Sequence, residues 1–252
     1  MVGLGTLINV LTILLGTALG VLLGGRLKDR TNQVVTDGLG LVTLVLGALN
    51  VAALLDAEFI SAVGSGFTLL VVLAAILLGG LTGSLLRIEQ RLESIGQWLQ
   101  FRFAGRSDNG DAGRERFITG FVSSSLIFTI GPLAILGAIS DGLGQGIDQL
   151  ALKSTLDGFA AIAFAAAMGW GVAFSALPVG IWQGLVTLIA LGFGSLLGPA
   201  EVSAMTATGG LLLIGIALRL LNIRQISVAD LLPALVFAPA IAWLVGVLMT
   251  GQ

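Results

Sequence analysis

Residues 123–137 read SSSLIFTIGPLAILG, and they lie within an apolar run long enough to cross a bilayer. Proline lacks an N–H group and clashes with the carbonyl four residues earlier, so we expect the helix to break near Gly131 and Pro132. Inside a membrane, a broken helix is tolerated where its freed backbone groups are buried in protein or line a wet cavity. If the protein moves a solute across a membrane, we expect the path to pass here.

The composition of the chain indicates a polytopic membrane protein of the all-α class. Of its 252 residues, 56% are hydrophobic and 10% are charged, whereas soluble domains carry about 25% charged residues. Cysteine and histidine are both missing from the sequence. Their absence excludes disulfides, catalysis by Ser-His or Cys-His pairs, and zinc sites built from these residues. We therefore expect no metal and no cofactor. We also expect no enzymatic activity, because Asp37 and Asp157 are predicted on opposite faces of the membrane and cannot form a pair of facing carboxylates.

Apolar runs of about 18–25 residues, the length that a bilayer requires, predict eight spans. They cover residues 3–25, 38–55, 65–86, 117–140, 157–175, 179–198, 202–221 and 230–249. Eleven of the twelve basic residues fall on the cytoplasmic side if the N-terminus is outside, and Lys153 is the exception. This bias predicts that both termini lie outside.

Residues 88–103 have apolar side chains on one helical face, which predicts an amphipathic helix along the cytoplasmic interface. The polar segment 105–116 follows as a cytoplasmic linker. It divides the chain into a first half, 1–104, with three spans and the interfacial helix, and a second half, 117–252, with five spans.

The two halves share an Asp-Gly pair at the start of a span, at Asp37 and again at Asp157. A three-span unit repeated once inserts with opposite orientation, so we interpret the pairs as traces of an inverted 3+3 repeat followed by two C-terminal spans. Transporters built in this way hold their site near the midplane between the repeats.

Asp37, Asp157 and Asp230 each begin a predicted span, where a carboxylate acts as an N-cap. The alternative is that one of them binds a cation or a proton. Asp157 is the best candidate, because Lys153 lies one helical turn earlier and could capture an anion. No predicted span has a charged residue at its centre, which argues against a midplane carboxylate relay.

Hydroxyl and amide side chains supply the remaining site candidates. Ser124, Ser125 and Thr129 precede the break in the fourth span; they either line the path or bond back to their own helix. Further polar lining could come from Asn9, Asn50, Gln183, Thr206 and Thr208, although amides in spans more often join helices. A second helix break is conceivable after Thr208.

Several segments resemble one known family: SLIFTIGPLAILG (125–137), KSTLDGFAAIAFA (153–165), FSALPVGIWQG (174–184) and TGGLLLIGIALRLLNI (208–223). It is the YqgA/YdfK-like family of bacterial inner-membrane proteins, domain-of-unknown-function family 554. The resemblance covers nearly the whole chain and implies a multi-pass protein of the bacterial inner membrane. It implies no substrate and no site residues.

These observations favour a secondary transporter of a small solute or ion. Its expected site comprises Ser124, Ser125, Thr129, Gly131 and Pro132, with Lys153 and Asp157 at the outer mouth. One alternative is an oligomeric channel, which would show a continuous wet path. Another is a non-transporting regulatory partner, which would expose a groove of small residues such as Gly16, Gly20 and Gly24. The expected partners are the lipid bilayer, the solute and further copies of the chain, with no nucleic acid.

Overall fold

The computed structural model describes residues 2–24, 29–99, 111–129, 132–193 and 197–250, and its regular structure there is entirely helical. The helices are α1 (Leu4–Gly24), α2 (Asp29–Val51), α3 (Ala57–Val63), α4 (Thr68–Leu86), α5 (Ile88–Leu99), α6 (Asp111–Thr129), α7 (Pro132–Gly142), α8 (Asp148–Met168), α9 (Ala176–Phe193), α10 (Pro199–Leu220) and α11 (Ala234–Thr250). Three 3-10 turns join some of them: η1 (Ala52–Leu55), η3 (Gly169–Ser175) and η4 (Val228–Leu231). The all-α class predicted from composition is confirmed.

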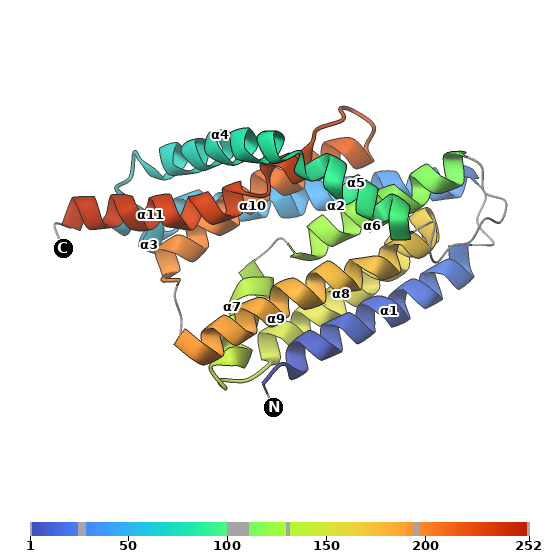
Figure 1. The fold of residues 1–252 in the computed structure, drawn as a ribbon, viewed down its shortest axis with the longest axis horizontal. Helices are drawn as coiled ribbons and strands as arrows, with labels where there is room; N and C mark the ends of the chain where they lie inside the picture. Colours follow the sequence, from blue (N-terminus) through green and yellow to red (C-terminus); the bar gives the residue numbers. More distant parts are fainter. Residues whose placement is uncertain (1, 25–28, 100–110, 130–131, 194–196, 251–252) are drawn as a thin grey trace. The chain divides into compact units, whose positions relative to one another are not determined.

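Six helical segments of the described chain are long and apolar enough to cross a membrane, or seven if α6 and α7 form one bent span. One of the six is a 45-residue segment, Asp148–Gly192, that contains α8, η3 and α9. A straight helix of that length would measure about 68 Å, roughly twice the thickness of a bilayer core. The chain folds back at η3 instead (Figure 1). The eight predicted spans stay a prediction, with α8 and α9 as candidates for the fifth and sixth.

Packing divides the chain into two compact units, which we call unit 1 and unit 2. Unit 1 comprises residues 1–39, 91–129 and 133–195; unit 2 comprises residues 40–90, 130–132 and 196–252. Both units therefore take residues from either side of the predicted 105–116 linker. Residues 105–110 of the linker lie outside the described residues, and residues 111–116 form the start of α6 instead. The division of the chain into halves stays a prediction.

In unit 1, α1 packs along α8 through three glycines spaced four residues apart. A Cβ atom built on Gly16, Gly20 or Gly24 would lie 2.3–2.4 Å from a backbone carbonyl oxygen of α8. Small residues at this spacing let helix backbones approach closely. The groove of small residues is thus filled by α8, so it is not the exposed groove that the hypothesis of a non-transporting partner requires. The carbonyls that it meets advance from Gly158 to Ala166, so α1 and α8 run in the same direction (Figure 1).

Helices α6 and α9 of unit 1 run against this pair. Along α6, Phe117 meets Gly171 and Phe128 meets Phe164, so α6 is antiparallel to α8. Helix α9 returns after η3 and packs on α1, with Gly180 facing Val10. At the start of α1, the carboxylate of Asp141 in α7 accepts hydrogen bonds from the backbone N–H groups of Gly3 and Gly5, both at 3.1 Å. A carboxylate at this end of a helix satisfies unpaired donors and favours the positive end of the dipole.

In unit 2, α4 packs antiparallel to α11. A Cβ atom built on Gly79 would lie 2.3 Å from the nitrogen of Ala234, and one on Gly64 would lie 3.7 Å from the sulfur of Met249. Apolar residues from α3, α4, α10 and α11 form the core of this unit, including Phe59, Val72, Ala207 and Ala238. Gly47 of α2 lies against Ile214 and Gly210 of α10, and these two helices are also antiparallel.

The amphipathic helix predicted at 88–103 is present as α5 through Leu99; residues 100–103 lie outside the described residues. A polar clamp holds its first turn to unit 2. The carboxylate of Glu89 accepts from the backbone N–H of Ala229 at 2.8 Å and pairs with Arg219. In return, Asp230 accepts from the backbone N–H of Glu89 at 2.9 Å.

The structure corrects the expected N-caps. Asp37 is an interior residue of α2, which begins at Asp29, and Asp157 is an interior residue of α8, which begins at Asp148. Asp230 lies in η4, before α11. Apolar length marks where a span enters lipid, whereas a helix continues through polar helix-forming residues beyond that point. Helices α2 and α8 therefore begin well before the predicted spans 38–55 and 157–175, whereas α11 begins at Ala234, after the predicted start of the eighth span at 230.

Candidate functional site

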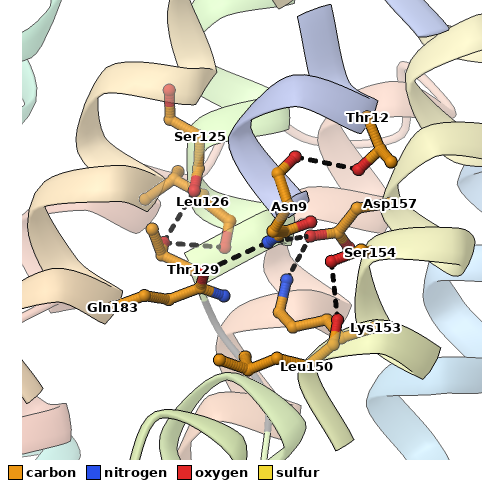
Figure 2. A network of polar contacts seen from close by, with 10 residues as sticks. All are labelled: Asn9, Thr12, Ser125, Leu126, Thr129, Leu150, Lys153, Ser154, Asp157 and Gln183. Carbon is orange, nitrogen blue, oxygen red and sulfur yellow. Dashed lines mark hydrogen bonds and ion pairs between the residues drawn. The ribbon is translucent and has the colours of Figure 1, made fainter. Parts of the chain in front are cut away.

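A cluster of buried polar side chains lies in unit 1, where α1, α8 and α9 meet (Figure 2). We call it the amide–ion cluster: Asn9 from α1, Lys153 and Asp157 from α8, and Gln183 from α9. All four side chains are buried, and Asn9 and Gln183 have no exposed surface. Close packing of α1 on α8 through glycines places Asn9 within reach of Asp157. The turn at η3 then returns Gln183 to the same level.

Two atoms connect the four residues: Asp157 Oδ2, which Lys153 and Asn9 contact, and Asn9 Nδ2, which also reaches Gln183. Lys153 Nζ and Asp157 Oδ2 form an ion pair one helical turn apart. Asn9 Nδ2 donates to the same oxygen at 3.0 Å and to Gln183 Oε1 at 3.2 Å. The carboxylate thus contacts one charged donor, Lys153, and one neutral donor, Asn9. A buried charge requires such compensation.

The ion pair lies deep within an apolar helix. Asp157 is the tenth of the 21 residues of α8, so it is about 14 Å along a helix of roughly 31 Å. Asp157 thus lies in the middle of α8, whereas the predicted span that begins at 157 placed the carboxylate at an edge. The expectation that no span centre holds a charged residue stays a prediction, because a helix end does not mark where a span enters lipid. Charged residues within spans are costly, and their default interpretation is functional.

Two atoms of the cluster make no hydrogen bond within the described part of the chain: Asn9 Oδ1 and Gln183 Nε2. The amide orientations follow from the carboxylate, because Asn9 must present its NH₂ group to Asp157. The second hydrogen of that group then requires the oxygen of Gln183 opposite to it. One acceptor and one donor are left over as a result. Buried polar atoms without partners are rare and call for an explanation.

Two threonine hydroxyls continue this pattern beside the cluster. Thr6 precedes Asn9 by three residues on α1, and Thr187 follows Gln183 by four on α9. Both are buried, and neither Oγ1 atom makes a hydrogen bond within the described residues. Sequence reasoning missed both. The spacings of three and four residues, which place side chains on one helical face, were the signal that could have found them.

The predicted break in the fourth span agrees with the ends of the described helices. Helix α6 ends at Thr129 and α7 begins at Pro132, and their axes differ by 77°. Gly131 lies outside the described residues. The hydroxyls before the break donate to carbonyls of their own helix: Ser124 to Gly120, Ser125 to Phe121 and Thr129 to Ser125, at 2.5–2.6 Å. Ser125 and Thr129 are drawn with the amide–ion cluster in Figure 2, and α6 packs against α8 and α9.

The other lining candidates belong to unit 2. Asn50 lies in α2, and Thr206 and Thr208 lie in α10. Thr208 donates to the carbonyl of Ala204 at 2.8 Å. Helix α10 continues from Pro199 to Leu220, so the second break considered after Thr208 is wrong.

Long apolar helices, glycine-mediated packing and a buried polar cluster together define a multi-pass helical membrane protein. A family model described as "Protein of unknown function (DUF554)" matches residues 4–243. The chain belongs to this family, as the resemblance of its motifs indicated.

Two relatives match over nearly their whole length. An uncharacterized protein of Escherichia coli (strain K12), YqgA, is 31% identical over 235 residues, which is 93% of this chain and 94% of YqgA. The uncharacterized membrane protein YdfK of Bacillus subtilis (strain 168) is 25% identical over 241 residues, 96% of each chain. No solved structure matches the chain.

Proposed function

We propose that this protein is a secondary transporter of a small solute in the bacterial inner membrane, with its binding site at the amide–ion cluster. Asn9, Lys153, Asp157 and Gln183 would bind the solute, and Ser125 and Thr129 would line the approach where the α6–α7 pair is broken. The proposal shifts the expected site from the break to the neighbouring cluster. It assigns no enzymatic activity.

The observation that carries the proposal is a buried ion pair within an apolar helix, beside amide atoms that lack partners. A buried ion pair contributes little net stability, because desolvation offsets the attraction between its charges. Apolar side chains of similar volume would pack this region at no greater cost. The polar groups are accounted for if they bind something that enters from water.

Burial favours a carrier over a fixed pore. Asn9 and Gln183 have no exposed surface, and Ser154, beside Lys153, is 1% exposed. A channel requires a wet path to such groups, whereas a carrier has conformations in which the site is closed.

Helix directions support the alternation of spans in the proposed topology; that both termini face outside rests on the distribution of basic residues alone. Spans that alternate in direction require the first and fifth to be parallel and the fourth and sixth to oppose them. In unit 1, α1 and α8 are parallel and α6 and α9 run against them (Figure 1). In unit 2, the antiparallel pairs α4–α11 and α2–α10 fit spans three and eight, and two and seven. The inverted repeat stays a prediction.

Binding and flux test the proposal together. The purified full chain is screened against a panel of small solutes for a rise in thermal stability, because a ligand of the folded state stabilises it by RT ln(1 + [L]/Kd). Each solute that binds is then offered to proteoliposomes. We expect saturable uptake, lost in the variant Gln183→Met. Uptake should persist in Thr155→Val, an exposed neighbour of the ion pair whose hydroxyl bonds only to its own helix.

Two results would overturn the proposal. One is that proteoliposomes take up every panel solute no faster than empty liposomes. The other is uptake that is equally fast in the wild type and in folded Gln183→Met, which would place the path elsewhere in the molecule.

A further inference from the structure

We infer that the amide–ion cluster selects an uncharged solute that carries both a hydrogen-bond donor and an acceptor, of the primary carboxamide class. This inference rests on the proposed function, because it assigns a ligand class to the same site. Three features of the cluster support this ligand class: its balanced charges, its two unpaired atoms and the register of α1 on α9.

The charges of the cluster already balance. Lys153 and Asp157 neutralise each other through a direct contact, and Asn9 adds a second donor to the same carboxylate oxygen. An anion would have to draw Lys153 away from its partner, and a cation would have to draw Asp157 away. Either exchange leaves one buried charge uncompensated, which is costly. A solute without net charge requires neither exchange.

The unpaired atoms are complementary to a carboxamide. Asn9 Oδ1 needs a donor and Gln183 Nε2 needs an acceptor, and both atoms are fully buried. An amide group offers an N–H and a carbonyl oxygen side by side, so a single planar group can satisfy both. A carboxylate offers acceptors only, and an amidinium offers donors only. Each charged group would therefore leave one of the two protein atoms unpaired.

The register of the helices extends this pattern along the solute. Helices α1 and α9 are antiparallel, with Val10 facing Gly180 and Asn9 bonded to Gln183. Because the helices are antiparallel, one turn before Asn9 on α1 lies level with one turn after Gln183 on α9. Thr6 and Thr187 therefore share this next level. Their free hydroxyls can donate or accept. The site thus offers uncharged hydrogen-bonding groups on two successive levels.

Three probes of nearly identical size and shape test the inference: acetamide, acetate and the acetamidinium ion. They differ in charge and in their donors and acceptors. Binding to the full chain in nanodiscs is measured by saturation-transfer NMR and by thermal stability. A four-atom ligand can gain at most about 6 kcal/mol, so each probe is titrated to about 100 mM. We expect acetamide to bind at least about tenfold more tightly than either ion, the equivalent of one unpaired buried group.

Variants separate the site from nonspecific effects. Gln183→Met removes the unpaired donor with little change in volume, and acetamide affinity should fall about tenfold; Thr155→Val should leave it unchanged. If Gln183→Met does not fold, the ranking of the three probes on the wild type still decides. Acetate or acetamidinium binding as tightly as acetamide would overturn the inference, and so would a ranking that persists in folded Gln183→Met. Uptake of a charged panel solute that depends on Gln183 would overturn it while leaving the proposed transport standing.

Discussion

At the scale of single residues, the cluster is a case in which position along a helix decides the role of a side chain. Lys153 and Asp157 lie one turn apart, and that spacing predicts an ion pair in any environment. Near water such a pair is worth a few tenths of a kcal/mol. Within α8 both side chains are buried, so each charge depends on the other for compensation.

A double-mutant cycle measures this dependence. Lys153→Met and Asp157→Asn should each lower the free energy of unfolding by about 3–5 kcal/mol, because each leaves a buried charge without its partner. The double variant should be more stable than the sum of the two losses predicts, by at least about 1 kcal/mol. Unfolding is followed in mixed micelles by tryptophan fluorescence.

Asp148→Asn serves as the matched control for that cycle. It removes a carboxylate from the exposed first turn of the same helix. Its cost should stay below about 1 kcal/mol, the usual range of a charge at a helix end. If the two losses in unfolding free energy simply add in the double variant, Lys153 and Asp157 do not compensate each other. That result would contradict the buried ion pair.

At the scale of elements, glycine contacts decide which helices pack and in which direction. Gly16, Gly20 and Gly24 form a stripe that the sequence shows plainly. Such a stripe could pack against any helix that approaches it closely, whether in this chain or in another membrane protein. In the structure its partner is α8, where carbonyls approach so closely that no Cβ atom fits. That approach also places Asn9 next to Asp157.

Alanine at two glycines tests this packing. A Cβ atom at Gly20 would lie 2.3 Å from the carbonyl oxygen of Ile162, whereas nothing lies within 4 Å of one at Gly184. Both substitutions gain the same helix propensity, so their difference reports the contact. We expect Gly20→Ala to be about 1–3 kcal/mol less stable than Gly184→Ala in the same unfolding assay. Equal stabilities would contradict the α1–α8 contact.

The polar clamp on α5 gives a second prediction at this scale. Glu89 is buried, and its carboxylate pairs with Arg219 and accepts from the backbone of Ala229. Glu89→Ala removes the acceptor of the Ala229 N–H and the carboxylate that pairs with Arg219, which should cost about 1–3 kcal/mol locally. Hydrogen exchange at residues 88–99 and 228–231 should accelerate by about tenfold or more. Glu115→Ala, at an exposed position of α6, should leave exchange in those segments unchanged.

At the scale of the whole molecule, basic residues predict orientation and helix contacts predict relative direction, and the two agree. The charge bias comes from loops, whereas the parallel and antiparallel pairs come from packing within the units. Since these sources are independent, their agreement supports spans that alternate in direction; the count of eight and the placement of both termini outside stay predictions.

Single cysteines test this topology on a clean background, because the chain has no cysteine of its own. Ser65→Cys and Gln145→Cys lie in exposed connections that should face outside. Arg114→Cys and Gln225→Cys lie in exposed positions that should face the cytoplasm. A membrane-impermeant maleimide should label the first pair in intact spheroplasts and the second pair only after lysis. Labelling of positions 114 and 145 from the same side would contradict the topology.

The sequence by itself determined the class of protein, the break before Pro132, the interfacial helix and the glycine stripe. Each follows from local chemistry: apolar length, the missing N–H of proline, amphipathic spacing and small side chains. It also paired Lys153 with Asp157 at a span edge, and it singled out Asn9 and Gln183 as separate candidates on other helices. Only the tertiary structure brought the two amides to the ion pair. Helix ends extend beyond the apolar run, so α8 carries Asp157 to its middle, and the pairing of α1 with α8 depends on contacts between residues about 145 positions apart. The physical reason is that hydrophobic length is read along one segment, whereas a buried polar site forms between segments.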